Sequence, residues 1–207
     1  RGNKPLKKTK AFSLKKDHTR KRFEFTELIL QKKITGDQIL FTDEKQFGLT
    51  VRGNPQIERV WTTPEFREKL KDGDEEANNL ITRPYDTQQE KVMVSAGISS
   101  RGVTRIQFYI GTQNTKNYIE SLQYFKEDIE RLSPDPENTL FYQYDLAPPH
   151  KGARKEIKEV FKNVLPEWCP KGADFSPVEL LWAHVEKELH RKTYENIHQL
   201  KYELQDL

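Results

Sequence analysis

Three acidic residues stand at the boundaries of predicted secondary-structure elements, where they could do chemistry together. Asp43 closes the apolar run ILFT, Asp145 closes the run TLFYQY, and Glu179 opens the helix-like stretch PVELLWAHVEKEL. Carboxylates gathered at the edge of a core repel one another and are costly to ionise unless a cation pairs with them. Mg²⁺ prefers carboxylate oxygens and works on phosphate esters. The pattern therefore suggests a metal-dependent enzyme acting on nucleic-acid phosphodiesters.

Several other residues near these acids in the sequence allow less specific interpretations. Glu44 would point to the opposite face of a continuing strand from Asp43, so we expect it to support the site or the fold. His150 could contact a DNA phosphate, orient a ligand or simply start a helix. We expect Trp182 in the core rather than stacked on a base. His184 and His190 are expected on a solvated side of a helix.

Composition limits the class of protein. The chain of 207 residues is long enough for one sizeable domain or two small ones, and its 22 aromatic residues can build a core although only 34% of residues are hydrophobic. No apolar run approaches the roughly 20 residues that a membrane-spanning helix needs. The single cysteine, Cys169, excludes an intrachain disulfide, and the histidines show no zinc-ligand spacing.

The charge is unevenly distributed. Residues 1–22 carry a net charge of +9, whereas the remaining 185 residues sum to −6. Such a basic arm is typical of a segment that contacts phosphates, although a solvated linker or helix face is the plainer alternative. The candidate DNA-binding residues are Lys7, Lys8, Lys10, Lys15, Lys16, Arg20, Lys21 and Arg22, together with His150.

Periodicity and turn residues predict an α/β domain. The predicted helices are 17–33, 114–132, 151–161, 177–191 and 195–207, and Pro148-Pro149 is expected to break the chain before the third. The predicted strands are 38–42, 46–51, 57–61, 91–98, 104–110 and 140–144, with a short extended piece at 164–168. Segment 62–86 is expected to be a long polar loop and 169–176 a shorter one.

This order of elements matches a ribonuclease H-like fold. We expect a mixed sheet, with three antiparallel strands and then parallel strands, flanked by helices. In that fold the first and fourth strands are neighbours, which would place Asp43 beside Asp145. The placement rests on fold analogy, a weaker warrant than the residues themselves.

The sequence also resembles the catalytic domain of mariner-type DDE/D transposases over nearly its whole length. The first acid lies in ILFTDEKQF, the second in QYDLAPPH, which is similar to Gln-Asp-Asn-Ala-Pro-x-His, and the third in ADFSPVELLW, which is similar to Pro-Asp-Leu-Asn-Pro-Ile-Glu-Asn-Leu-Trp. RVWTTP at 59–64 resembles the Val-Trp-Arg-type segment before the family's long loop, and 4–25 resembles its linker and first helix. Leu146 stands where the family often has Asn.

The resemblance implies catalytic and metal-binding roles for Asp43, Asp145 and Glu179, with Mg²⁺ as cofactor and Mn²⁺ as a substitute. Asp174 is the rival third ligand, but it corresponds to the motif Asp that precedes the ligand, so Glu179 is preferred. The implied activity is cut-and-paste transposition, in which phosphodiesters at transposon ends are hydrolysed and the freed 3′ ends are joined to target DNA.

The resemblance also implies partners and a domain organisation. The partners would be double-stranded DNA, namely transposon terminal inverted repeats and target DNA, and a second copy in a homodimer, with no membrane. Residues 1–36 would form the basic linker and leading helix, and 37–207 the catalytic domain with a clamp-like loop at 62–86. A DNA-binding domain would lie upstream of Arg1. The location would be the nucleus in a eukaryote and the cytoplasm otherwise.

Two other functions stay open at this point. One is another ribonuclease H-like nuclease, which would cut RNA–DNA hybrids or junctions. The other is a domesticated, catalytically inactive DNA-binding protein, for which three clustered acids would have no use.

Overall fold

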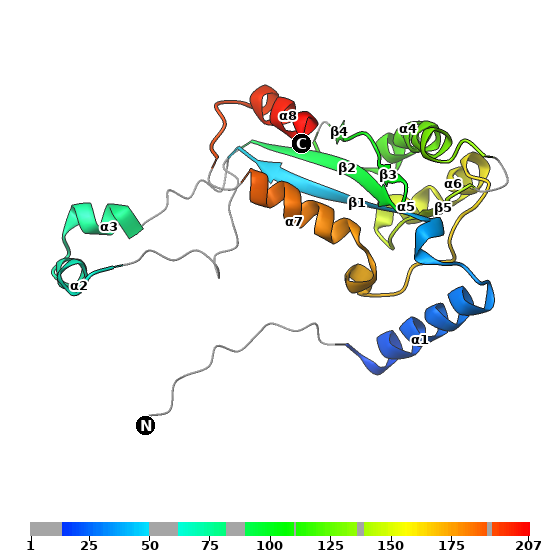
Figure 1. Cartoon of the computed structure of the whole chain (residues 1–207), viewed down its shortest axis with the longest axis horizontal. Coiled ribbons are helices and arrows are strands. Elements are labelled where there is room, and N and C mark those ends of the chain that lie inside the picture. Colours follow the sequence, from blue (N-terminus) through cyan, green and yellow to red (C-terminus); the bar gives the residue numbers. More distant parts are fainter. Residues whose placement is uncertain (1–13, 50–61, 82–89, 110, 136–138, 190–191) are drawn as a thin grey trace.

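A mixed β-sheet forms the centre of the computed structural model, which describes residues 14–49, 62–81, 90–109, 111–135, 139–189 and 192–207. The strands in these ranges are β1 (Ile39–Gly48), β2 (Lys91–Ser99), β3 (Gly102–Val103), β4 (Gln107–Tyr109) and β5 (Phe141–Gln143). Their order is β3-β2-β1-β5, and β4 also pairs with β2 (Figure 1). β1 is parallel to β5, whereas β2 is antiparallel to β1, β3 and β4.

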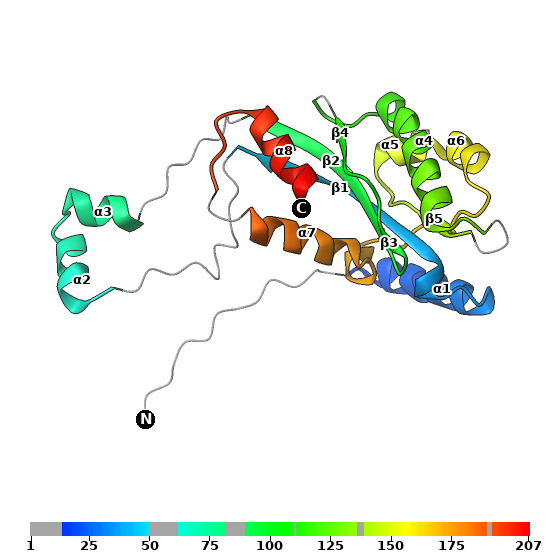
Figure 2. The same cartoon turned by 45° about the horizontal axis from the view of Figure 1, so that its top comes forward.

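Helices cover both faces of this sheet. The α-helices in the described ranges are α1 (Lys16–Gln31), α2 (Pro64–Lys71), α3 (Glu75–Ile81), α4 (Thr115–Leu132), α5 (Pro148–Gly152), α6 (Arg154–Val160), α7 (Val178–Glu188) and α8 (Ile197–Asp206). α4, α5 and α6 pack on one face, and α7 and α8 pack on the other (Figure 2). No helix in the described ranges combines the length and the apolar character that crossing a membrane requires.

The alternation of side chains along β1 separates two hydrophobic cores. Phe41 and Phe47 face the core that contains Trp182 of α7, and Leu40 faces the core that contains Leu122 of α4. Because successive strand residues point to opposite faces, Asp43 shares the α7 face and Glu44 shares the α4 face. The sheet therefore places these two adjacent acids on opposite sides.

β1 is one long strand, whereas the sequence predicts two strands at 38–42 and 46–51. The polar stretch Asp43–Gln46 looks like a turn in isolation, but it pairs without interruption with β2, with Asp43 opposite Ala96. Its side chains also find partners, such as Glu186 for Lys45 at 2.8 Å. Asp43 consequently lies in the middle of a strand rather than at its end.

Two further elements differ from expectation. The segment 62–86, predicted as a loop, contains α2 and α3, which lie away from the sheet (Figure 1). Thr63 caps α2 by accepting a hydrogen bond from the Phe66 amide, and Pro64 occupies the first turn, where a missing N–H costs nothing. For the same reason Pro148 begins α5 instead of breaking the chain. The predicted strand at 57–61 lies outside the described residues.

The predicted helix at 151–161 is divided between α5 and α6, and among the described residues of the predicted strand at 104–110 only β4 is a strand. Several other expectations agree with the structure. β2, α4, α7 and α8 lie within a few residues of their predicted positions, and 164–168 is extended, with Val164 bridged to Tyr142. The strands that carry or precede Asp43 and Asp145 are expected to be neighbours, as the first and fourth strands of the fold. The parallel pairing of β1 with β5 confirms this expectation. α1 is docked on the domain through Phe25, whose ring meets that of Trp168 edge-on at 5.1 Å.

Candidate active site

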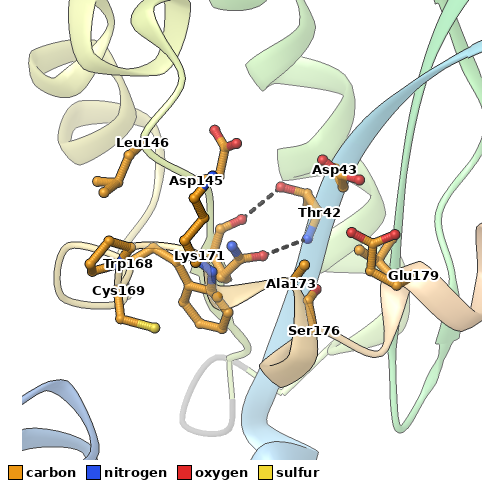
Figure 3. Close-up of a pocket in the computed structure, with 14 residues that line it drawn as sticks. Thr42, Asp43, Asp145, Leu146, Trp168, Cys169, Lys171, Ala173, Ser176 and Glu179 are labelled. Carbon is orange, nitrogen blue, oxygen red and sulfur yellow. Dashed lines mark hydrogen bonds between the residues drawn. The ribbon is translucent and has the colours of Figure 1, made fainter. Parts of the chain in front are cut away.

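One pocket of about 220 Å³ collects all three candidate acids at the end of β5 (Figure 3). Asp43 comes from β1, Asp145 from the segment after β5, and Glu179 from the first turn of α7. Residues 168–173 form another part of its wall. Acids that are 102 and 34 positions apart in sequence thus reach a single cavity because β1 pairs with β5 and α7 packs against β1.

Asp43 can reach the pocket because β5 ends opposite Phe41, so no β5 residue pairs with β1 at Asp43. The last paired position is Phe41 with Gln143, and Thr42 is tied to Gln143 by two hydrogen bonds of 2.9 and 2.6 Å. Oδ2 of Asp43 accepts a hydrogen bond from Nε1 of Trp182 at 3.0 Å. Burial, with the negative charges of Glu44 and Glu179, raises the pKa of Asp43 to about 6, although hydrogen bonds from the Glu44 backbone and Trp182 oppose the rise.

Asp145 is held through one of its two oxygens. Oδ1 accepts a hydrogen bond from the Ala147 amide at 2.7 Å and lies 2.6 Å from Nδ1 of His150. Burial alone would raise the pKa of Asp145, but the hydrogen bonds from His150 and Ala147 outweigh it and hold that pKa below its ordinary value. Asp145 is therefore ionised at neutral pH.

His150 links Asp145 to Glu44. Its side chain is 2% exposed, and its Nε2 lies 3.3 Å from Oε2 of Glu44 in an ion pair that is poorly aligned for a hydrogen bond. Burial alone would lower the pKa of His150, but the carboxylates of Asp145 and Glu44 raise it to about 9. The imidazole is therefore protonated at neutral pH and carries an N–H toward each acid.

Glu179 is exposed and lies next to Asp43 on one side of the pocket, with Asp145 on the other side (Figure 3). Its position in the first turn of α7 is favourable for a negative charge. The rival acid, Asp174, is 58% exposed and makes a two-pronged ion pair with Arg22, and it is not among the residues that line the pocket. Of these two acids, Glu179 lines the pocket and Asp174 does not.

The donor set fits a hard divalent cation in chemical type. Three carboxylates in one pocket supply oxygen ligands. Burial first, and then the charges of Glu44 and Glu179, raise the pKa of Asp43, and a cation at the pocket would offset both effects. Within the described ranges, however, no three acidic, His or Cys side chains stand close enough to form a finished metal site. Asp145 is turned toward His150 and apart from the other two acids (Figure 3). Closing such a site would need a movement of these side chains.

Sequence reasoning missed two partners in this site. Trp182 is in the core as predicted, at 1% exposure, but its indole N–H also reaches Asp43. Its spacing of three from Glu179, one turn of the same helix, was the available signal. Glu44 faces away from the pocket as predicted, but its contact with His150 joins two segments that are distant in sequence. Nothing local in the sequence indicates that pairing.

The predicted DNA-binding residues are only partly described. Lys7, Lys8 and Lys10 lie outside the described residues. Lys15 and Lys16 are exposed at the start of α1, and Arg20 and Lys21 both pair with Asp17 on the surface of that helix. Arg22 differs, because its guanidinium binds Asp174 and the Lys171 carbonyl and lies 4.4 Å from the centre of the Phe175 ring. His184 is exposed on α7 as predicted, and His190 lies outside the described residues.

The sheet order and the placement of the helices define a ribonuclease H-like fold, as the sequence predicts. Among solved structures, the chain is similar to the Mos1 transposase paired-end complex with left transposon end, with a TM-score of 0.77 and 17% identity over 99% of this chain and 58% of the other. It is similar to the Mos1 strand transfer complex with a TM-score of 0.74 and 17% identity, covering 98% and 57% of the two chains.

The isolated catalytic domain of Mos1 mariner transposase matches with a TM-score of 0.66 and 17% identity, covering 94% of this chain and 82% of that one. The chain thus spans little more than half the length of the Mos1 chains in the DNA complexes. No protein-family model matches the sequence, and no curated protein matches it either. At this level of identity, the likeness establishes the fold.

Proposed function

We propose that this chain is the catalytic domain of a mariner-type DNA transposase. It would hydrolyse phosphodiesters at transposon ends and join the freed 3′ ends to target DNA. The observation that carries the proposal is the convergence of Asp43, Asp145 and Glu179 on one pocket, in a fold shared with Mos1 transposase. One of the similar Mos1 structures is a paired-end complex with the left transposon end, and further ones, a paired-end complex among them, contain Mn or Mg.

Asp43, Asp145 and Glu179 are the residues that would hold Mg²⁺ or Mn²⁺. When bound at carboxylates, such cations lower the pKa of an attacking water or hydroxyl and neutralise the charge that develops on the phosphate. Three oxygen donors and no sulphur or imidazole ligand in the set favour a hard cation over zinc. Asp43 lies next to Glu179 in the pocket, so both carboxylates would be near a cation bound there.

The chain's own residues prepare this pocket for a cation. Asp43 is ionised above about pH 6, and its charge adds to that of Glu179, so these two carboxylates repel a DNA backbone and attract cations. Trp182 fixes one Asp43 oxygen by its N–H, and His150 fixes one Asp145 oxygen. These two carboxylates are therefore restrained before substrate arrives, which lowers the cost of the side-chain movement that closes the site.

DNA would approach along the basic arm. Its lysines and arginines would contact the backbone, which gives affinity and salt dependence but no choice of sequence. Recognition of terminal inverted repeats would belong to a domain upstream of Arg1.

The α2–α3 segment, with Leu80 and Ile81 exposed at its end, would act as the clamp on a second copy in a homodimer. The protein would act in the nucleus of a eukaryote or in the cytoplasm otherwise.

A strand-transfer assay tests this function. The protein is incubated with Mn²⁺, a supercoiled plasmid and a 5′-labelled duplex oligonucleotide that exposes a 3′-hydroxyl. We expect label to join the plasmid and the plasmid to be nicked. Asp43→Asn, Asp145→Asn and Glu179→Gln should each abolish both products, whereas Asp174→Asn should retain them. Absence of both products with the unaltered chain would contradict the proposal.

The same assay separates the alternative functions. Cleavage of the RNA strand of an RNA–DNA hybrid, with no joining of DNA, would assign the chain to another class of ribonuclease H-like nuclease. Binding of DNA without cleavage of either substrate in Mg²⁺ or Mn²⁺ would favour a domesticated, inactive DNA-binding protein.

A further inference from the structure

His150 and Glu44 form a second group of ionisable residues directly behind the pocket. We propose that His150 is a positioning residue for Asp145, and that Glu44 holds the His150 ring in place for this task. Neither residue lines the pocket that contains the three acids. The inference deepens the proposed function and rests on it, because it concerns how one of the three acids is oriented toward a cation.

The first argument is which oxygen of Asp145 is engaged. His150 Nδ1 and the Ala147 amide both approach Oδ1, at 2.6 and 2.7 Å. Among the described residues, no hydrogen bond or ion pair to Oδ2 is found, and the side chain of Asp145 is 46% exposed. The two donors thus restrict the rotation of the carboxylate while leaving its second oxygen available to a ligand.

The second argument is the rigidity of His150 itself. Its ring centre lies 4.2 Å from that of Tyr118 on α4, and Tyr144 approaches it edge-on at 6.2 Å. The Tyr118 hydroxyl is in turn hydrogen bonded to that of Tyr142 in β5, at 3.0 Å. A buried imidazole packed between aromatic rings has few rotamers open to it, so it can hold a carboxylate in one orientation.

The third argument is the position of Glu44. Its side chain is only 11% exposed, and a buried acid is costly unless it is paired. Its partner is Nε2 of His150, and its neighbour in β1 is Asp43. His150 therefore connects Glu44 in β1 to Asp145 in the segment after β5. These two segments are the ones that must bring Asp43 and Asp145 together.

Partners of this kind behind a metal ligand fix its orientation, and losing them commonly weakens metal binding tenfold to a hundredfold. The test is the affinity of the chain for Mn²⁺ without DNA, measured by electron paramagnetic resonance of the free ion and by tryptophan fluorescence. The variants are His150→Gln, His150→Asn and Glu44→Gln. The matched control is His184→Gln, which removes an exposed histidine from the helix that carries Glu179.

The three variants separate the two contacts of the ring. The Asn amide nitrogen takes the place of Nδ1 and can still donate to Asp145, whereas the Gln amide nitrogen takes the place of Nε2 and cannot. We therefore expect His150→Gln to raise the apparent Kd for Mn²⁺ by about tenfold to a hundredfold. His150→Asn should recover much of this loss, Glu44→Gln should fall between them, and His184→Gln should match the unaltered chain.

Circular dichroism and thermal melting establish that each variant is folded. A folded His150→Gln with unaltered Mn²⁺ affinity would overturn the inference while leaving the proposed function intact. If His150→Gln does not fold, the Mn²⁺ affinity of Glu44→Gln tests the inference instead. A Glu44→Gln affinity equal to that of the unaltered chain would overturn it. If the unaltered chain binds no Mn²⁺, or Asp43→Asn binds it equally well, both the inference and the proposed function fail.

Discussion

The indole nitrogen of Trp182 donates a hydrogen bond to Oδ2 of Asp43 across 3.0 Å, from the core of α7 to the middle of β1. Trp182 lies three residues after Glu179, so the same helix that presents one acid also orients another. The indole packs edge-on against Phe47, with ring centres 6.2 Å apart, which keeps its N–H directed at the pocket. The side chain of Trp182 thus contributes both to the packing of the core and to the geometry of the site.

Removing this N–H should impair catalysis beyond any loss of stability. Trp182→Phe keeps an aromatic ring but deletes a hydrogen bond to a charged group, worth about 1.5–3 kcal/mol. We expect the strand-transfer rate at saturating Mn²⁺ to fall by roughly tenfold to a hundredfold. Val185→Ala, at another buried position of α7, should lower the melting temperature without a comparable change in rate. Equal losses of rate in the two variants, each assayed well below its melting temperature, would contradict this role.

Asp43 should destabilise the fold when it is ionised and no cation is present. Its folded-state pKa of about 6 lies above the ordinary value of 3.8, so the folded state binds the proton more tightly than the unfolded state. The cost is absent below the unfolded pKa, grows as pH rises between the two values, and is fully present above pH 6. Its size at pH 8 is at most about 3 kcal/mol.

Asp43→Asn should therefore be more stable than the unaltered chain at pH 8 in EDTA, by about 1–3 kcal/mol. The gain should shrink below pH 6 and vanish near pH 4. Urea denaturation across this pH range measures it, and added Mg²⁺ should narrow the difference at pH 8 by stabilising only the unaltered chain. A gain that is independent of pH, or a variant less stable at pH 8, would contradict the pKa assignment.

The choice between Glu179 and Asp174 is testable by matched substitutions. Glu179→Gln should reduce strand transfer by at least about a hundredfold while leaving the melting temperature almost unchanged, because Glu179 is exposed. Asp174→Asn should keep the rate within about twofold and cost less than about 1 kcal/mol of stability through its exposed ion pair with Arg22. The reverse pattern of rates would assign the third position to Asp174.

Lys15 and Lys16, exposed at the start of α1, should contribute to DNA affinity through phosphate contacts alone. Replacing both with Gln should lower the slope of log K against log salt concentration by about 2, with no change in preference among DNA sequences. Fluorescence anisotropy with labelled duplexes at several salt concentrations measures this slope. Lys116→Gln/Lys155→Gln removes the same charge from the opposite face of the sheet and should leave the slope unchanged.

Local sequence features predicted the fold well wherever one periodicity dominated. The apolar spacing of Tyr118, Leu122, Phe125 and Ile129 placed α4, and the apolar runs before Asp43 and Asp145 placed the paired strands β1 and β5. The sequence failed where tertiary partners override local signals. Asp43–Gln46 continues a strand because β2 pairs with it and long-range partners satisfy its charges.

The candidate acids could be named from sequence, but their surroundings could not. Trp182 reads as a core residue because indole rings are usually buried, and only the crossing of α7 over β1 brings its N–H to Asp43. Glu44 and His150 are more than a hundred positions apart, and their contact depends on the parallel pairing of β1 and β5. The starts of α2 at Thr63 and of α5 at Pro148 have recognisable helix-start residues. Nearby polar residues and prolines nevertheless favour the prediction of a loop or a break there.

The most direct test of the central claim is the anomalous scattering of Mn²⁺ soaked into crystals of this domain. The account predicts a peak bound by Asp43 and Asp145, with Glu179 beside it and Asp174 still paired with Arg22. An anomalous peak elsewhere, or none at these acids in crystals both with and without DNA, would contradict a metal-dependent site at this pocket.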